Sequence, residues 1–236
     1  MEIVRVVLGR AVWLFDTQEL NPRGVATYPD LYVAFGKRYQ FATLPKAEDI
    51  HSGGSVYFKH GKFTFETNSI AVDFELHNDG LVVNTRHSTE AADGLLQDTL
   101  AWCEDQFSIK YPANLIKKRI HRSELIVSMN PKLDGSEVAR QGSRNSAAGA
   151  LQVEPSHGLA SKIQQFTTAV SSTIATNNIG VTGLQFGSQE VPAALFIERR
   201  AGNVPFEDNH YLSNAWATTG RHLELLQTFE QIMSAE

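Results

Sequence analysis

Cysteine is nearly absent from this sequence, because Cys103 is the only one in 236 residues. A lone thiol cannot form an internal disulfide or supply the thiolate cluster of a structural zinc site. No stretch of about 18 consecutive apolar residues occurs, so the sequence predicts no transmembrane helix. Residues 1–10 lack the basic, apolar and small-residue order of a secretory signal. Together with the absence of any Asn-x-Ser/Thr sequon, these features predict a soluble, cytoplasmic protein that does not bind membranes.

Positive charge is not in excess either. The 21 Lys and Arg residues are outnumbered by 26 Asp and Glu, which leaves a net charge of −5 and no global attraction to nucleic acid. The chain still has one dense basic cluster, which consists of Lys117, Lys118, Arg119, His121 and Arg122. This cluster could bind phosphate or a nucleic-acid backbone. Because Tyr111 is the only aromatic residue nearby, a charged strand edge that resists aggregation explains the cluster equally well.

The common catalytic motifs are missing. Gly61-Lys62 is followed by Phe63 where a phosphate-binding loop needs serine or threonine, and His222 lacks the neighbouring glutamate and second histidine of a zinc protease. Cys103 falls on the apolar stripe of a predicted helix, where a thiol is usually a small core residue. The sequence therefore supplies no catalytic residue, and we expect no cofactor.

Residues 55–87 predict a four-stranded antiparallel meander. Residues 55–59 and 62–66 flank His60-Gly61, which suits a tight two-residue turn. Residues 70–77 alternate apolar and polar side chains, as expected for a half-buried strand. The turn at residues 78–80 then leads into a last strand at residues 81–87.

Amphipathic helices are expected to pack on this sheet, which makes the fold class α+β. Ser88 or Thr89 can cap a helix that continues to Phe107, and a shorter helix is expected from Pro29 to Arg38. Another helical stripe covers residues 159–174, and Ser213 or Asn214 is expected to open the last helix. Upstream, residues 3–8 and 11–15 read as a strand pair broken at Gly9-Arg10.

The C-terminal half predicts a mixed or second antiparallel sheet, with strands at residues 124–129, 181–186 and 193–199. Residues 132–156 are rich in glycine, serine and charge, and we expect a long mobile loop that contains Arg140 and Arg144. We find no internal repeat in the sequence. The chain therefore reads as a single α+β domain over residues 1–236, with a division into two subdomains near 110–120 as the alternative.

One constellation suggests a metal site. If the turns at residues 60–61 and 78–80 lie at the same sheet edge, His60, His77 and Asp79 come within roughly 10 Å of one another. Glu75 shares a face with His77, and imidazole with carboxylate suits zinc or iron. The competing explanation is that these polar residues simply face solvent or serve the turns.

We interpret the chain as a non-catalytic protein-interaction or assembly module of an intracellular complex that binds a protein partner or forms a homo-oligomer. An edge strand at residues 55–59, with Val56, Tyr57 and Phe58, is apolar enough to need covering. The last helix also carries a wide apolar surface that includes Trp216 and Phe229. Two alternatives remain: a metal-dependent hydrolase using the His60, Glu75, His77 and Asp79 edge, and a nucleic-acid-binding accessory protein using Lys117, Lys118, Arg119 and Arg122.

Overall fold

The computed structural model describes residues 1–20, 28–46, 48, 55–109, 114–129, 165–166, 168, 184–186, 195–199 and 208–234. They form two compact units, Leu8–His121 and Met1–Val7 with Arg122–Glu236. We call these the first module and the second module. Strands β1 (Glu2–Leu14) and β5 (Lys118–Ser128) each contribute residues to both.

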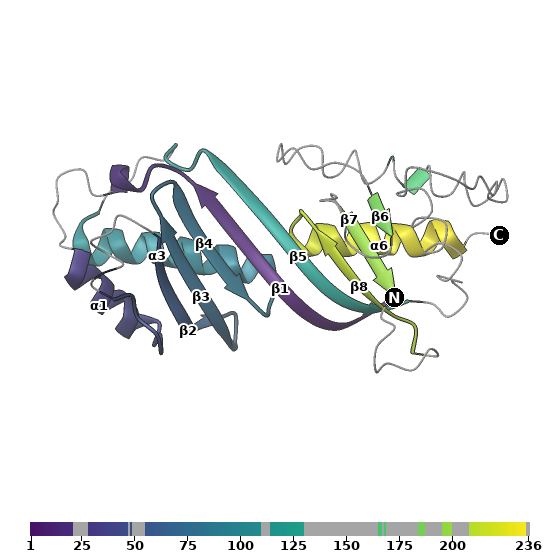
Figure 1. The fold of residues 1–236 in the computed structure, drawn as a ribbon, viewed down its shortest axis with the longest axis horizontal. Helices are drawn as coiled ribbons and strands as arrows, with labels where there is room; N and C mark the ends of the chain where they lie inside the picture. Colours follow the sequence, from purple (N-terminus) through teal and green to yellow (C-terminus); the bar gives the residue numbers. More distant parts are fainter. Residues whose placement is uncertain are drawn as a thin grey trace. The chain divides into compact units, whose positions relative to one another are not determined.

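The first module is an antiparallel sheet covered on one face by helices (Figure 1). After β1 come the 3-10 helix η1 (Thr17–Leu20), helix α1 (Tyr28–Arg38), strands β2 (Val56–Phe65), β3 (Asn68–His77) and β4 (Gly80–Thr85), and helix α3 (Thr89–Phe107). The strand order is β2-β3-β4-β1, with antiparallel pairing throughout. The predicted α+β class and the antiparallel meander are confirmed.

The predicted turn at His60-Gly61 is wrong, because β2 runs through it as one strand. The β2–β3 hairpin turns at Glu66 and Thr67 instead. The register shifts between Phe58 and Gly61, where His60 adopts a φ of 58°. A Cβ on Gly61 would lie 2.4 Å from the ring of Phe41, so this glycine makes room for an aromatic side chain. The meander therefore has three strands, with β1 as the fourth strand of the sheet.

Strand β1 is also continuous, and the predicted break at Gly9-Arg10 is wrong. Gly9 pairs with Thr85 inside the sheet. A Cβ at Gly9 would lie 2.2 Å from the carbonyl oxygen of His87, so the glycine permits a close backbone approach rather than a turn. Residues 39–43 contribute no strand to the sheet, only an isolated bridge between Thr43 and Lys59.

The core of the first module lies between the sheet and the two helices. Ser88 caps α3 by accepting a hydrogen bond from the backbone N–H of Ala91, as predicted. Below the cap, Leu95, Leu96 and Leu100 of α3 are fully buried against the sheet. Phe35 of α1 completes this core, since its ring lies 4.8 Å from that of Phe58 and 4.7 Å from that of Phe74.

The second module has a mixed sheet. Strands β6 (Leu184–Phe186), β7 (Leu195–Arg199) and β8 (His210–Ala215) precede helix α6 (Thr219–Ser234), and the strand order is β5-β8-β7-β6. β6 pairs with β7 in parallel, whereas β7–β8 and β5–β8 are antiparallel. The predicted helix start at Ser213 or Asn214 is wrong, because both residues belong to β8. The segment is a strand whose Tyr211 and Ala215 pack in one buried cluster with Leu225 and Leu226 of α6.

The two modules repeat the same arrangement of three strands and a helix. In the first module, β1 pairs Gly9 with Thr85 of β4, and β3 pairs Val72 with the same residue. In the second module, β5 pairs Ser123 with Ala215 of β8, and β7 pairs Leu195 with it. Every other pair in these ladders keeps the same offset. The parallel strand β6 departs from the pattern, since its counterpart β2 is antiparallel.

The repeat can be seen in the sequence when the two modules are aligned by the pairing of their strands. Five identical pairs lie 130 positions apart across β4–α3 and β8–α6: Asn84 and Asn214, Thr89 and Thr219, Leu95 and Leu225, Leu96 and Leu226, Gln97 and Gln227. The asparagines occupy the same sheet position, and the leucines face the core beneath each helix. The expectation that the chain has no internal repeat is therefore wrong.

Several predicted segments lie outside the described residues. They include the expected mobile loop at 132–156 with Arg140 and Arg144, and most of the helix expected at 159–174. Within that helix Phe166 is described, and its buried ring lies 5.0 Å from that of Phe229 in α6. No helix in the described part of the chain has the length and apolar character needed to cross a bilayer.

Candidate functional sites

The expected metal edge does not assemble. His60 lies inside β2, where the register with β3 shifts but the chain does not turn. Its backbone N–H donates a hydrogen bond to the carboxylate of Asp73 at 2.7 Å. His77 ends β3 four residues from Asp73, about 13 Å along a strand. Among the described residues, no three His, Cys, Asp or Glu side chains are grouped to hold a metal ion. The proposed convergence of His60 with His77 and Asp79 is therefore wrong, because it depended on a turn that is absent.

His77 and Glu75 do come together, in a different arrangement. On the sheet face opposite the helices, the imidazole Nε2 of His77 lies 3.1 Å from a carboxylate oxygen of Glu75. The other oxygen of Glu75 accepts a 2.9 Å hydrogen bond from Asn84, and the guanidinium of Arg10 lies 4.0 Å away. Ser55 contacts Nδ1 of His77 at 2.6 Å. This half-buried cluster joins a contact within β3 to cross-strand contacts with β4 and β1, and such contacts stabilise a sheet surface.

The basic cluster is divided by the strand that carries it. Residues 119 and 121 point to one face of β5, and residues 118, 120 and 122 to the other. The Arg119 guanidinium lies 4.2 Å from the ring centroid of Trp13. The indole N–H of Trp13 donates to Asp93 at 2.7 Å, and the other oxygen of Asp93 lies 2.8 Å from Nε2 of His121. Arg119 and His121 thus contact an aromatic ring and a carboxylate of the same module.

Arg122 is occupied in the second module. Its guanidinium bonds Glu124 at 2.5 Å and Asn214 at 3.2 Å, and it lies 5.6 Å from the ring of Trp216. Lys117 makes an exposed 4.0 Å ion pair with Glu19. β5 is also not an edge strand, because it lies between β1 and β8 in the strand order. The Lys117, Lys118, Arg119 and Arg122 set therefore forms no continuous basic surface for a phosphate backbone.

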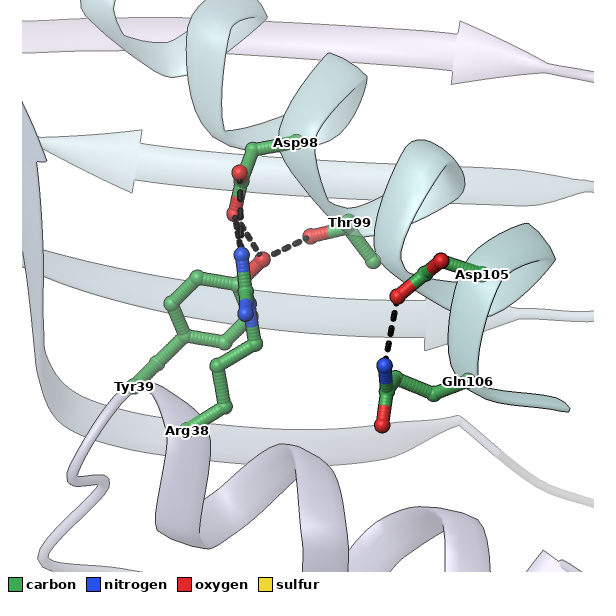
Figure 2. Close-up of polar contacts among 6 residues, drawn as sticks. All are labelled: Arg38, Tyr39, Asp98, Thr99, Asp105 and Gln106. Carbon is green, nitrogen blue, oxygen red and sulfur yellow. Dashed lines mark hydrogen bonds and ion pairs between the residues drawn. The ribbon is translucent and has the colours of Figure 1, made fainter.

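A third polar network joins the end of α1 to α3 (Figure 2). The Arg38 guanidinium bonds both carboxylate oxygens of Asp98, at 3.0 and 2.9 Å. The Tyr39 hydroxyl donates to Asp98 at 2.5 Å and accepts from Thr99 at 3.3 Å. Burial, followed by the hydrogen bond to Asp98, raises the pKa of Tyr39 well above its ordinary value. The phenol therefore stays protonated, and the network works as a clamp between two helices rather than as an acid–base site.

Cys103 is not an activated nucleophile. It lies on α3, and burial raises the pKa of its thiol to about 12 despite the opposing charge of Arg38. A thiol with such a pKa is neutral near pH 7 and reacts slowly.

The second module holds a buried serine–histidine pair. The Ser213 hydroxyl donates to the Phe196 carbonyl at 2.7 Å, and its oxygen lies 2.9 Å from Nε2 of His222. Because the Ser213 hydroxyl donates its proton to the Phe196 carbonyl, its oxygen accepts a hydrogen bond from the Nε2–H of His222. Its Nδ1 is buried and has no hydrogen-bond partner. Burial lowers the pKa of His222 to about 3, so the ring is neutral in the folded protein. With no solvent access to either residue, this pair belongs to the core.

Strand β2 offers an accessible edge. It is the last strand in the order of the first module. Residues 39–43 cover its middle, at residues 59–62: the N–H and C=O of Lys59 bond Thr43 at 3.1 Å, and the Lys62 N–H donates to the Tyr39 carbonyl at 2.7 Å. Within the described residues, no strand pairs with the outer side of β2 at residues 56–58. Backbone groups of alternate residues point to the same side of a strand, so those of Tyr57 point outward like those of Lys59.

Exposed apolar side chains occur on β2 and on the segments that pack against it. Tyr57 is 44% exposed on β2, and Val33 of α1 is 50% exposed. Leu44, which follows the bridge to β2, is 45% exposed and lies over Gly36, one turn after Val33 on α1. The Tyr57 side chain points to the sheet face opposite α1, where its ring lies 6.2 Å from that of His77.

No protein-family model, no curated protein and no solved structure matches this chain.

Proposed function

We propose that this protein is a non-catalytic interaction module that binds an extended segment of a partner chain at the β2 edge. The observation that carries the proposal is the outward-facing backbone of Tyr57 on the last strand of the sheet, with the Tyr57 side chain 44% exposed. In strand addition, backbone hydrogen bonds supply affinity, and side chains beside the edge select the residues of the incoming strand. An exposed apolar edge strand otherwise favours aggregation.

Charge favours an acidic partner segment. Lys59, His60 and Lys62 are exposed along β2, and Lys37 is exposed on the neighbouring end of α1. The chain as a whole carries a net charge of −5, so this edge is more basic than the average surface. Lysines on an edge strand also discourage pairing with the edge strands of other proteins. A strand with acidic side chains forms ion pairs with these lysines, whereas a strand without acidic side chains does not.

Selection of displayed peptides on the full chain tests the proposal. We expect enrichment of extended peptides that alternate apolar and acidic residues. Their affinity should fall as salt rises, because exposed charges are screened. Tyr57→Asp and Lys59→Glu should each weaken binding by about tenfold or more, since one removes an anchor and the other reverses a charge.

Val4→Asp is the matched control, because Val4 is 48% exposed on β1 but belongs to the second module. It should leave the affinity of the selected peptides unchanged. Failure to enrich any peptide, or equal loss of binding in Val4→Asp and Tyr57→Asp, would refute binding at the β2 edge.

A further inference from the structure

The first module contains a partly open cavity of about 90 Å³ between its helices and its sheet. Helix α1 contributes Leu31, Tyr32 and Phe35 to its wall, and α3 contributes Leu100 and Cys103. Phe58 of β2 also lines the cavity, on the helix-covered face of the sheet, whereas the partner segment is proposed to bind the backbone edge of that strand.

Aromatic packing and the clamp at Asp98 explain why the cavity stays open. The ring of Tyr32 lies 5.7 Å from that of Phe58 in an edge-to-face arrangement, and Phe35 packs on Phe58 in the same way. These rigid rings separate α1 from the sheet. Arg38 and Tyr39 then fasten the C-terminal end of α1 to α3 through Asp98, so the helix cannot settle further into the space.

The chemistry of the wall is apolar. The Thr17 hydroxyl donates to the Asn78 carbonyl at 3.0 Å, and the Thr99 hydroxyl donates to Tyr39 at 3.3 Å, so both threonines have partners within the protein. The Cys103 thiol is neutral. None of the described residues that line the cavity is ionised, so a charged ligand would lose its hydration without gaining a partner among them.

We propose that this cavity is a binding site for a small, uncharged apolar ligand of the alkyl class. An engineered cavity of about 150 Å³ with aliphatic and aromatic walls stays dry and takes up benzene or xenon, which shows that such sites bind without polar contacts. The smaller cavity here suits a short alkyl group. Such a ligand would restore the van der Waals contacts that the wall residues otherwise lack.

Methyl NMR spectra of the full chain under xenon pressure, and with n-pentane, test the site. Both probes should shift the methyl resonances of Leu31, Leu81 and Leu100, which line the cavity. Sodium butyrate, which has a similar chain but carries a charge, should not shift them. Shifts with butyrate, or no shift of these methyls with xenon and pentane, would overturn the proposal.

Substitutions at Cys103 separate filling of the cavity from loss of the thiol. Cys103→Met adds volume toward the cavity and should weaken pentane binding by about tenfold or more, whereas Cys103→Ala should leave the binding intact. Leu31→Phe fills the space from α1 and provides a second test if Cys103→Met does not fold. Unchanged pentane binding in a folded filling variant would place the ligand elsewhere and refute the assignment.

Discussion

At the scale of single residues, the Ser213–His222 pair is the clearest departure from the repeat. The first module has Val83 and Ala92 at the matching positions, both fully buried. The second module thus buries a titratable ring where its counterpart has only apolar atoms. The pKa of His222 is about 3 in the folded chain and about 6.5 in the unfolded chain. Between these pH values the unfolded chain binds a proton at His222 that the folded chain does not bind.

This difference predicts an acid-dependent loss of stability. Above pH 6.5 the free energy of unfolding contains the full contribution of neutral His222. As the pH falls from 6.5 toward 3, this contribution is lost, which lowers the free energy of unfolding by on the order of a few kcal/mol in total. The double variant Ser213→Val with His222→Leu should flatten the dependence of unfolding free energy on pH in this window. His60→Gln removes an exposed histidine and serves as the control, which should keep the wild-type slope. Identical slopes for the double variant and the wild type would show that His222 does not titrate on unfolding.

At the scale of secondary-structure elements, the two helices after β4 and β8 begin in the same way. Ser88 accepts a hydrogen bond from the Ala91 N–H at 3.2 Å, and Thr218 accepts one from the Arg221 N–H at 3.4 Å. Ser88→Ala should lower the free energy of unfolding by about 1 kcal/mol, because it leaves a helix N–H without its cap. Denaturant titration measures the change. Ser88→Asp retains a capping oxygen and should stay near wild type, and an unchanged midpoint for Ser88→Ala would exclude the cap as a stabilising contact.

Local patterns predict the elements that depend on local physics. The start of α3 at Ser88 and the alternation of β3 could be predicted, because capping and side-chain period act over a few residues. The course of β2 through Gly61 could not be predicted from local patterns. The glycine is needed there because it leaves room for the ring of Phe41, which lies 20 residues away in the sequence.

At the scale of the whole molecule, each module has its own core. Leu96 and Leu226 hold matching positions in the repeat, are fully buried, and belong to separate clusters. Each Leu→Ala variant should lower stability by about 2–5 kcal/mol, since it leaves a cavity in a packed core. Residue-resolved hydrogen exchange should show faster exchange mainly in residues 8–121 for Leu96→Ala and mainly in residues 122–236 for Leu226→Ala. Equal acceleration in both modules by either variant would contradict two separate cores.

The repeat itself was hidden at the sequence level. Its five identities are spread over 14 positions, from Asn84 to Gln97 and from Asn214 to Gln227, and the apolar positions between them tolerate exchange. Only the strand registers show that Asn84 and Asn214 occupy the same place. The sequence predicted an edge strand at residues 55–59, and the strand order places β2 at the end of the sheet.

The exchange rate of the Tyr57 amide tests the proposed edge most directly. In the free chain, the Lys59 amide is bonded to Thr43 and should exchange slowly, whereas the outward Tyr57 amide should exchange much faster. Saturation with a selected acidic peptide should slow exchange at Tyr57 by about tenfold or more and leave Lys59 nearly unchanged. If Tyr57 is as protected as Lys59 in the free chain, or if a bound peptide leaves its exchange unchanged, strand addition at β2 is wrong.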